Sequence, residues 1–216
     1  MGKSELQLRQ WGLLDYGLAL ERLRRRHGLR VAGLAPDALI LVEHPPALTQ
    51  GRHGQAANVL ASPGELSARG VVLYHIERGG DVTYHGPGQA VVYPVLHLAQ
   101  RGLRVRGLVE ALLEAAQETV AYYGVRAQPD FRNPGLWVGR RKLAAVGLAV
   151  KERVSLHGLA LNVTTQLEDF LLIKGCGLEA QPTSLARELG RPLPAKAVGL
   201  RLLEALAGRL GCCFSD

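Results

Sequence analysis

A glycine-rich segment carries the densest group of potential ligand-binding residues in the chain. Residues 78–89 read RGGDVTYHGPGQ, with four glycines and one proline in twelve residues. Glycine permits positive φ angles and a close approach of the backbone to a ligand. The segment also supplies five side chains that can form hydrogen bonds, namely Arg78, Thr83, Tyr84, His85 and Gln89. The spacing matches neither GxxxxGK[ST] nor GxGxxG, so a phosphate-binding loop is not indicated. A hairpin connection built from ordinary turn residues is the plainer alternative.

Later in the chain, a cysteine and a lysine have the chemistry of a nucleophile and its acid/base partner. Cys176 lies between Gly175 and Gly177, which leave its thiol accessible and free the neighbouring N–H groups to form an oxyanion hole. Lys142 lies in the strand-like stretch RKLAAVG at 141–147, where burial would lower the pKa of the ammonium and suit it to proton transfer. Taken alone, a cysteine is more often a small buried hydrophobe, and most lysines are solvated charges.

A fourth segment, SLHGLALNV at 155–163, alternates small and large residues. Gly158, Ala160 and Asn162 fall on one face of a strand with this pattern. That face could form the floor of an apolar slot, and an ordinary core strand is the alternative.

The elements that must position these segments alternate between strand-like and helix-like patterns. Apolar periodicity and capping signals predict helices at 13–25, 62–69, 105–123, 186–189 and 198–210. Period-2 or continuous apolar runs predict strands at 6–8, 38–42, 71–76, 90–98, 135–138, 142–150 and 156–163. Residues 167–173 fit either type, and Pro94 indicates an edge strand or a bulge.

This order of elements predicts an α/β (α+β) fold in which one layer of mixed sheet is covered by helices. The length fits a single domain over residues 1–216, with 190–194 as the one candidate boundary.

The composition narrows the possible partners. A net charge of +7 and a pI near 9.7 favour an acidic partner. A nucleic-acid-binding module would also explain the charge, but aromatic residues are only 5% of the chain and no recognised binding motif is present. We therefore expect no nucleic-acid partner.

The sequence also indicates where the protein is located and whether it binds a metal ion. The sequence has no apolar run long enough to span a bilayer and no secretory signal pattern, which predicts a cytoplasmic protein without a membrane partner. The adjacent Cys212 and Cys213 disfavour a relaxed disulfide, so the thiols are expected to be reduced. No cysteine or histidine spacing is typical of a metal site, and none is expected.

Taken together, the four segments resemble the lipoyl(octanoyl) transferase family, which moves an octanoyl group from acyl carrier protein to lipoyl domains. The matching stretches are RGGDVTYHGPGQ at 78–89, RKLAAVG at 141–147, SLHGLALNV at 155–163 and the glycine-flanked Cys176. Their order and intervals also match. The resemblance implies the biotin/lipoyl protein ligase fold and a reaction without a cofactor. One departure is Gly175, where the family often has proline.

The resemblance also implies roles and partners. Cys176 would form the acyl thioester, and Lys142 would activate it. The acyl-substrate site would be lined by Arg78, Gly79, Gly80, Asp81, Val82, Thr83, Tyr84, His85, Ala145, Val146, Gly147, Gly158, Leu159 and Ala160. The donor would be octanoyl-acyl carrier protein. The acceptors would be lipoyl domains of 2-oxoacid dehydrogenase complexes and the glycine cleavage H protein. Cys212 and Cys213 have no implied role.

Three alternatives stay open. An ATP-dependent lipoate–protein ligase on the same fold would form an acyl-adenylate and need no nucleophilic cysteine. A transferase that moves lipoyl or octanoyl groups between protein domains would share most of the site. Within the transferase mechanism, His85 or His157 could replace Lys142 as the base.

Overall fold

The computed structural model describes residues 6–174 and 181–211, so Cys176, Cys212 and Cys213 lie outside the described residues. The main sheet has the strand order β1-β2-β6-β10-β9-β8-β7, and β11 pairs with β9. In chain order its strands are β1 Leu6–Leu13, β2 Asp37–Glu43, β6 Gln89–Val95, β7 Gln128–Asp130, β8 Gly135–Val138, β9 Arg141–Lys151, β10 Val154–Asn162 and β11 Gln181–Pro182. The β1–β2 and β11–β9 pairs are parallel and the others are antiparallel, which confirms the predicted mixed sheet.

A second, three-stranded sheet has the order β4-β3-β5. Its strands are β3 Ala47–Gln50, β4 Val72–His75 and β5 Val82–His85. The prediction of a single sheet layer was therefore wrong. The cause is the segment at 78–89, whose glycines and proline indicated a continuous connection. Its central residues instead pair with β3 as β5.

The helices are α1 Tyr16–Val31, α2 Pro63–Ala68, α3 Val105–Tyr122, α4 Leu185–Leu189 and α5 Ala195–Arg209. The described residues also form the short 3-10 helices η1 Ala56–Asn58, η2 Leu98–Arg101 and η3 Leu167–Leu172. The capping box predicted at the start of α2 is present, with reciprocal hydrogen bonds between Ser62 and Glu65. No helix in the described ranges is both long enough and apolar enough to cross a bilayer.

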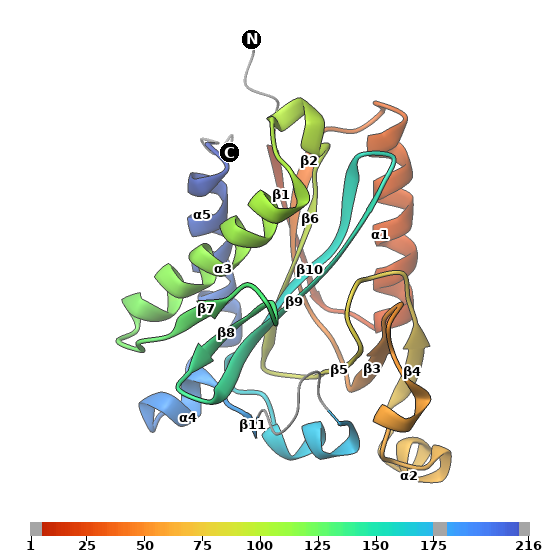
Figure 1. The fold of residues 1–216 in the computed structure, drawn as a ribbon, viewed down its shortest axis with the longest axis vertical. Coiled ribbons are helices and arrows are strands. Elements are labelled where there is room, and N and C mark those ends of the chain that lie inside the picture. Colours follow the sequence, from red (N-terminus) through yellow and green to blue (C-terminus); the bar gives the residue numbers. More distant parts are fainter. Residues whose placement is uncertain (1–5, 175–180, 212–216) are drawn as a thin grey trace.

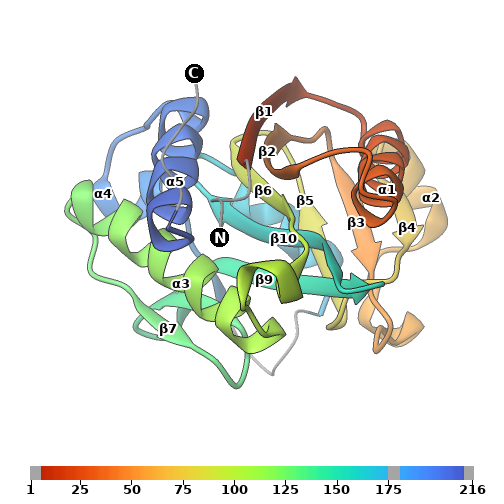
Figure 2. The ribbon, with the colours of Figure 1, turned by 90° about the horizontal axis from the view of Figure 1, so that it is seen from above.

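Helices cover both faces of the main sheet, with α3 and α5 on one side and α1 on the other (Figures 1 and 2). Alternate residues of β2 divide between these layers. Leu39 and Leu41 pack in the cluster of α3 and α5, whereas Ile40 and Val42 pack in the cluster of Leu23 on α1. A strand that is buried on both faces reads as a continuous apolar run, as residues 38–42 do.

The last helix belongs to the same core as the rest of the sheet. Residue 199 of α5 is a glycine, and a Cβ there would lie 2.6 Å from Leu41 Cδ1 of β2. The helix therefore approaches the sheet closely. Residues 190–194 lead into α5, whose buried apolar residues belong to the main core.

Pro94 lies in an interior strand, since β6 sits between β2 and β10. Of the two alternatives predicted for it, an edge strand or a bulge, the edge strand was wrong. The printed ladder between β6 and β10 stops at Leu159–Val92, and His157, which follows toward Pro94, has a φ of 61°. The Ser155 hydroxyl bridges the interruption: it donates to Pro94 O (2.7 Å) and accepts from the Leu96 N–H (3.0 Å). A proline without an N–H is tolerated here because its neighbour leaves the regular strand conformation.

A buried ion triad ties α1, β2 and η2 together. The Asp37 carboxylate is fully buried and accepts from Arg30 Nε (2.5 Å), from Arg101 Nε and from the His97 N–H (2.9 Å). Removing one member of such a group leaves uncompensated buried charge.

We expect Asp37→Asn to lower the free energy of unfolding by about 3–5 kcal/mol, because two guanidinium groups lose their buried counter-ion. Urea unfolding would measure the change. The matched control is Glu110→Gln, which breaks the exposed Arg106–Glu110 pair and should cost about 0.5 kcal/mol or less. Equal effects of the two variants would contradict a structural role for the triad.

Candidate functional site

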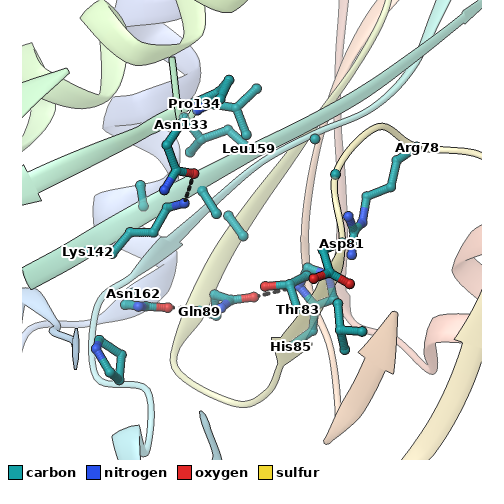
Figure 3. Close-up of a pocket in the computed structure, with 18 of the residues that line it drawn as sticks. Arg78, Asp81, Thr83, His85, Gln89, Asn133, Pro134, Lys142, Leu159 and Asn162 are labelled. Carbon is teal, nitrogen blue, oxygen red and sulfur yellow. Dashed lines mark hydrogen bonds between the residues drawn. The ribbon is translucent and has the colours of Figure 1, made fainter. Parts of the chain in front are cut away.

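A cavity of about 1040 Å³ lies between the main sheet and the small sheet (Figure 3). Its walls come from the segments singled out in the sequence: the start of the 78–89 segment, β9 and β10, joined by η3 and the residues after it. Figure 3 shows Lys142 and Asn162 on one side, and Arg78, Asp81, Thr83 and His85 on the other. A cavity of this size can hold a substantial ligand.

The loop before β5 docks on the main sheet through backbone contacts. The Gly79 N–H donates to Leu148 O of β9 at 2.8 Å. A Cβ at position 147 would lie 2.8 Å from Arg78 Cδ and 3.3 Å from Gly79 O. Gly147 is therefore a glycine because the loop lies directly on it.

The Arg78 side chain is held by the small sheet. Its Nη2 donates to Thr49 O (2.6 Å) and to Thr49 Oγ1 (2.9 Å) of β3. Gly51 leaves room for this arrangement, since a Cβ there would lie 2.5 Å from Gly80 O and 2.9 Å from Arg78 Nη1. The buried guanidinium thus forms a fixed cationic part of the cavity wall.

The remaining residues of the segment divide between the cavity and the core of the small sheet. Val82 and Thr83 line the cavity, and the Asp81 carboxylate, also in the wall, accepts from the Gln55 N–H (3.1 Å) and the Asn58 side-chain amide. Tyr84 is not among the lining residues. Its hydroxyl donates to Asp169 Oδ2 (2.7 Å), and its ring packs edge-on against Phe170. The structure therefore places Tyr84 in the packing between β5 and η3.

A chain of side-chain amides fixes the orientation of His85. Asn162 Nδ2 donates to the Thr183 carbonyl (3.0 Å), Gln89 Nε2 donates to Asn162 Oδ1 (2.9 Å), and Gln89 Oε1 lies 2.7 Å from His85 Nδ1. A carbonyl can only accept, so each donor in the chain is determined. It follows that His85 Nδ1 carries the proton and Nε2 does not.

His85 is uncharged at neutral pH. Burial, reinforced by the neighbouring His44, lowers the pKa of His85 to about 3. Burial also lowers the pKa of His157, the second histidine that lines the cavity. Both imidazoles therefore offer the site a neutral hydrogen-bonding ring.

Lys142 projects into the cavity from the start of β9, as Figure 3 shows. Its Nζ donates to Asn133 Oδ1 at 3.0 Å and lies 5.1 Å from the centre of the Trp137 ring. Gly135 makes room for it, since a Cβ there would lie 2.6 Å from Lys142 Cε. The Lys142 carbonyl also accepts from the Thr183 N–H (2.9 Å). The ammonium is thus positioned by both side-chain and backbone contacts.

The predicted nucleophile, Cys176, lies outside the described residues. The described residues on each side of it, Lys174 and Gln181, both line the cavity. Gln181 pairs with Arg141 and Pro182 with Lys142. The described residues that flank this segment in the sequence therefore lie at the cavity wall.

Small residues of β9 and β10 form the cavity floor. Ala145 pairs with Ala160 and Gly147 with Gly158 across the two strands. All of the floor residues predicted from these strands line the cavity: Ala145, Val146, Gly147, Gly158, Leu159 and Ala160.

Sequence reasoning missed Asn133, which lies in the loop before β8, where no pattern distinguished it. Gln89 was named as a possible hydrogen-bonding residue and Asn162 as part of the floor, and both line the cavity. The hydrogen bond that joins these two amides was not predicted. Within the described residues, no group of three or more His, Cys, Asp or Glu side chains is placed to hold a metal ion.

Comparison with known proteins gives consistent matches. Residues 15–207 match the lipoyl protein ligase A/B catalytic domain family. The octanoyltransferase of Syntrophobacter fumaroxidans (strain DSM 10017 / MPOB) is 45% identical over 188 residues, which cover 87% of this chain and 82% of that protein.

Solved structures share the fold at low sequence identity. A crystal structure of lipoate-protein ligase A bound with ATP superposes with a TM-score of 0.76 at 15% identity, over 100% of this chain and 88% of that one. The biotin protein ligase of Aquifex aeolicus gives a TM-score of 0.53 at 10% identity, over 97% of this chain and 70% of that one. The predicted biotin/lipoyl protein ligase fold is confirmed.

We expect Gly147→Ala to reduce kcat/KM for acyl transfer by at least about tenfold, because the added methyl displaces the Arg78–Gly79 loop. A misplacement of 1 Å in a site can cost about 100-fold in rate. Steady-state kinetics would measure this. The control is Gly28→Ala in α1, where a Cβ meets no described atom within 4 Å; it should leave kcat/KM unchanged. Full activity in Gly147→Ala would contradict the docking role of that glycine.

Proposed function

This chain belongs to the lipoyl protein ligase A/B catalytic domain family, and we propose that it is an octanoyltransferase of lipoate biosynthesis that works through a thioester on Cys176. The observation that carries the proposal is Lys142, held at the wall of a cavity whose floor is built from alanine and glycine. The 45% identity to an octanoyltransferase over most of both chains supports the same activity. The whole chain would act as one catalytic domain in the cytoplasm.

The proposed donor is octanoyl-acyl carrier protein. The Cys176 thiol loses its proton to the neutral amine of Lys142, and the thiolate attacks the donor carbonyl. The tetrahedral oxyanion then collapses, the bond to the carrier's sulfur breaks, and the Lys142 ammonium returns the proton to that leaving sulfur. The product is an octanoyl–Cys176 thioester and a free carrier thiol.

The proposed acceptor is a lysine on a lipoyl domain of a 2-oxoacid dehydrogenase complex or on the glycine cleavage H protein. Its neutral ε-amine attacks the octanoyl–Cys176 carbonyl and passes a proton to Lys142. The carbon–sulfur bond breaks, an amide forms, and Cys176 recovers its proton. Lys142 therefore serves as base and acid in each half of the reaction.

Asn133 supports this role for Lys142. Its Oδ1 accepts a hydrogen bond from Nζ, which directs the nitrogen in both its neutral and its charged form. Once Nζ has taken the thiol proton, the resulting ammonium favours the thiolate, the form that attacks thioesters. The histidines are weaker candidates for the base, because the pKa of His85 is near 3 and a base that weak gains few protons at neutral pH.

The nearest alternative is an ATP-dependent ligase, since the fold is shared with a lipoate-protein ligase. A ligase would need ATP and Mg²⁺ and would form an acyl-adenylate. Octanoyl transfer measured with both reagents omitted separates the two activities.

Mixing the protein with octanoyl-acyl carrier protein should add the mass of one octanoyl group to the wild type, because the thioester intermediate accumulates before acceptor is supplied. Intact mass spectrometry would detect it. Cys176→Ser should not show a hydroxylamine-labile adduct. An equal adduct in Cys212→Ser and Cys213→Ser is expected, and an adduct that survives in Cys176→Ser would overturn the assignment.

We expect Lys142→Ala to lower the transfer rate by about 100- to 10,000-fold, the range for loss of a general acid/base. The pH midpoint of Cys176 alkylation should rise toward that of a free thiol, about 8.5. The matched control is Lys151→Ala, an exposed lysine at the other end of β9, which should match the wild type. Unchanged alkylation curves in Lys142→Ala would remove Lys142 from the mechanism.

A further inference from the structure

Three rows of side chains cross the cavity floor from β6 through β10 to β9. The first row holds the amides of Gln89 and Asn162, which are paired across the strands. The second row is apolar and contains Val91, Ala160 and Ala145. In the third row Gly158 pairs with Gly147, and Tyr93, two residues beyond Val91 on β6, also lines the cavity. The floor is thus apolar in its middle and polar at both ends.

The apolar middle has the length of a short acyl chain. The first and third rows are four residues apart along each strand, or about 13 Å. An extended octanoyl group spans about 9 Å from its carbonyl carbon to its methyl carbon. The register that pairs Leu161 with Ala144 sets Lys142 one residue beyond the first row, and its long side chain can reach back to that level. A chain whose carbonyl lies at the first row therefore brings its terminal methyl to about 4 Å from the third row.

The loop at 78–80, which forms part of the cavity wall, lies over the floor at the third row. There the Arg78 side chain and Gly79 lie directly on Gly147, and the Gly79 N–H bonds to Leu148 O. Next to this point lies His157, which pairs with Leu148. The far end of the site is therefore built from a guanidinium, a phenol and an imidazole.

At this end of the site, His157 has a disfavoured backbone conformation and a buried ring to which no described residue is hydrogen-bonded. Its φ of 61° lies in the left-handed region, which non-glycine residues seldom adopt. The residue is only 2% exposed, yet neither ring nitrogen has a hydrogen-bond partner among the described residues. Its Nε2 lies 3.6 Å from Glu77 Oε2, which makes an ion pair only when the imidazole is protonated. Burial lowers the pKa of His157, and the neutral ring is too far from this carboxylate for a hydrogen bond. A buried, unpaired polar group at the wall of a cavity indicates a ligand-facing role.

We propose that His157, together with Tyr93 and Arg78, forms a polar end stop that determines the acyl chain length accepted by the site. The inference rests on the proposed function, because it places the acyl carbonyl at Lys142. A chain longer than eight carbons would press methylenes against these polar groups. Arg78 and Tyr93 are already hydrogen-bonded, to Thr49 and His44, whereas the imidazole has no hydrogen-bond partner among the described residues. A polar group at the tip of an eight-carbon chain would instead find a partner in the unpaired imidazole.

The competing position for the chain is the part of the cavity beside α3, where Val105 and Val109 line the wall. An acyl tail in that position would meet only apolar side chains at its end. The two positions predict opposite responses to a polar tip, and this difference is the basis of the test.

The first experiment compares nonanoyl and 8-hydroxyoctanoyl thioesters of acyl carrier protein, which differ only in a terminal methyl or hydroxyl. With a polar end stop, kcat/KM for the hydroxyl substrate equals or exceeds that for nonanoyl. An apolar end would disfavour the hydroxyl by about tenfold or more, the effect of burying it without a partner. A tenfold preference for nonanoyl would overturn the proposal.

The second experiment removes the imidazole. Glycine accepts a φ of 61° without strain, and His157→Gly should raise the decanoyl-to-octanoyl ratio of kcat/KM about tenfold, as expected for two more buried methylenes. The matched control is His157→Asn, since asparagine tolerates the left-handed region and keeps a polar group; it should retain acceptance of 8-hydroxyoctanoyl. An unchanged ratio in His157→Gly would also overturn the proposal.

Ratios keep the test independent of folding, because both substrates report on the same folded fraction of a variant. They also separate this inference from the proposed function. A wild type that transfers no octanoyl group would contradict the proposed function itself. A wild type that transfers octanoyl but discriminates against the hydroxyl tip contradicts only the end stop.

Discussion

The cavity depends on one contact: the loop at 78–80 lies on the backbone of β9. The hydrogen bond from Gly79 to Leu148 joins the connection that leads into the small sheet to the main sheet, and Gly147 lets the loop approach. Arg78 completes the connection by bonding to Thr49 in β3. Without this docking, the two sheets would have fewer contacts with each other, and the cavity between them would lack the wall that closes it at Gly147. The two glycine-containing motifs are therefore two sides of one interface.

Polar groups inside the cavity are fixed by hydrogen bonds to other side chains, and one chain of these bonds ends on the backbone of Thr183. His85 is oriented through Gln89 and Asn162, and Lys142 through Asn133. Fixed donors and acceptors in a water-poor site need little reorganisation when charge develops during a reaction. His157 differs from them, because its nitrogens have no such partner among the described residues. This contrast separates groups that the protein satisfies itself from one that faces the space available to a ligand.

Much of the fold could be predicted because local patterns agreed with tertiary burial. The helix at 105–122 and the strands at 135–138 and 141–151 were expected within one or two residues. β5 was not expected, since turn-forming residues on both sides hid its four residues. The edge alternative for Pro94 failed because a proline is tolerated there through His157 in the neighbouring strand, a relation between residues far apart in sequence.

The site was predictable to a similar degree and for similar reasons. Lys142 and the glycines of the motifs at 78–80, 147 and 158 do line one cavity, because resemblance to a family carries spatial information that periodicity lacks. The resemblance did not separate Tyr84 from its neighbours in β5, so Tyr84 was expected at the substrate although it packs against Phe170. Asn133 could not be anticipated, because it enters the site from a loop with no periodic pattern.

The peptide of Thr183 has a consequence for how the two halves of the site move. Its N–H binds the carbonyl of Lys142, and its carbonyl receives Asn162, the first link toward His85. A shift of this one peptide would therefore be transmitted in two directions, to the lysine's backbone and to the ring of the histidine. Thr183 therefore couples the position of the Lys142 amine to the orientation of the His85 imidazole, and the two cannot vary independently.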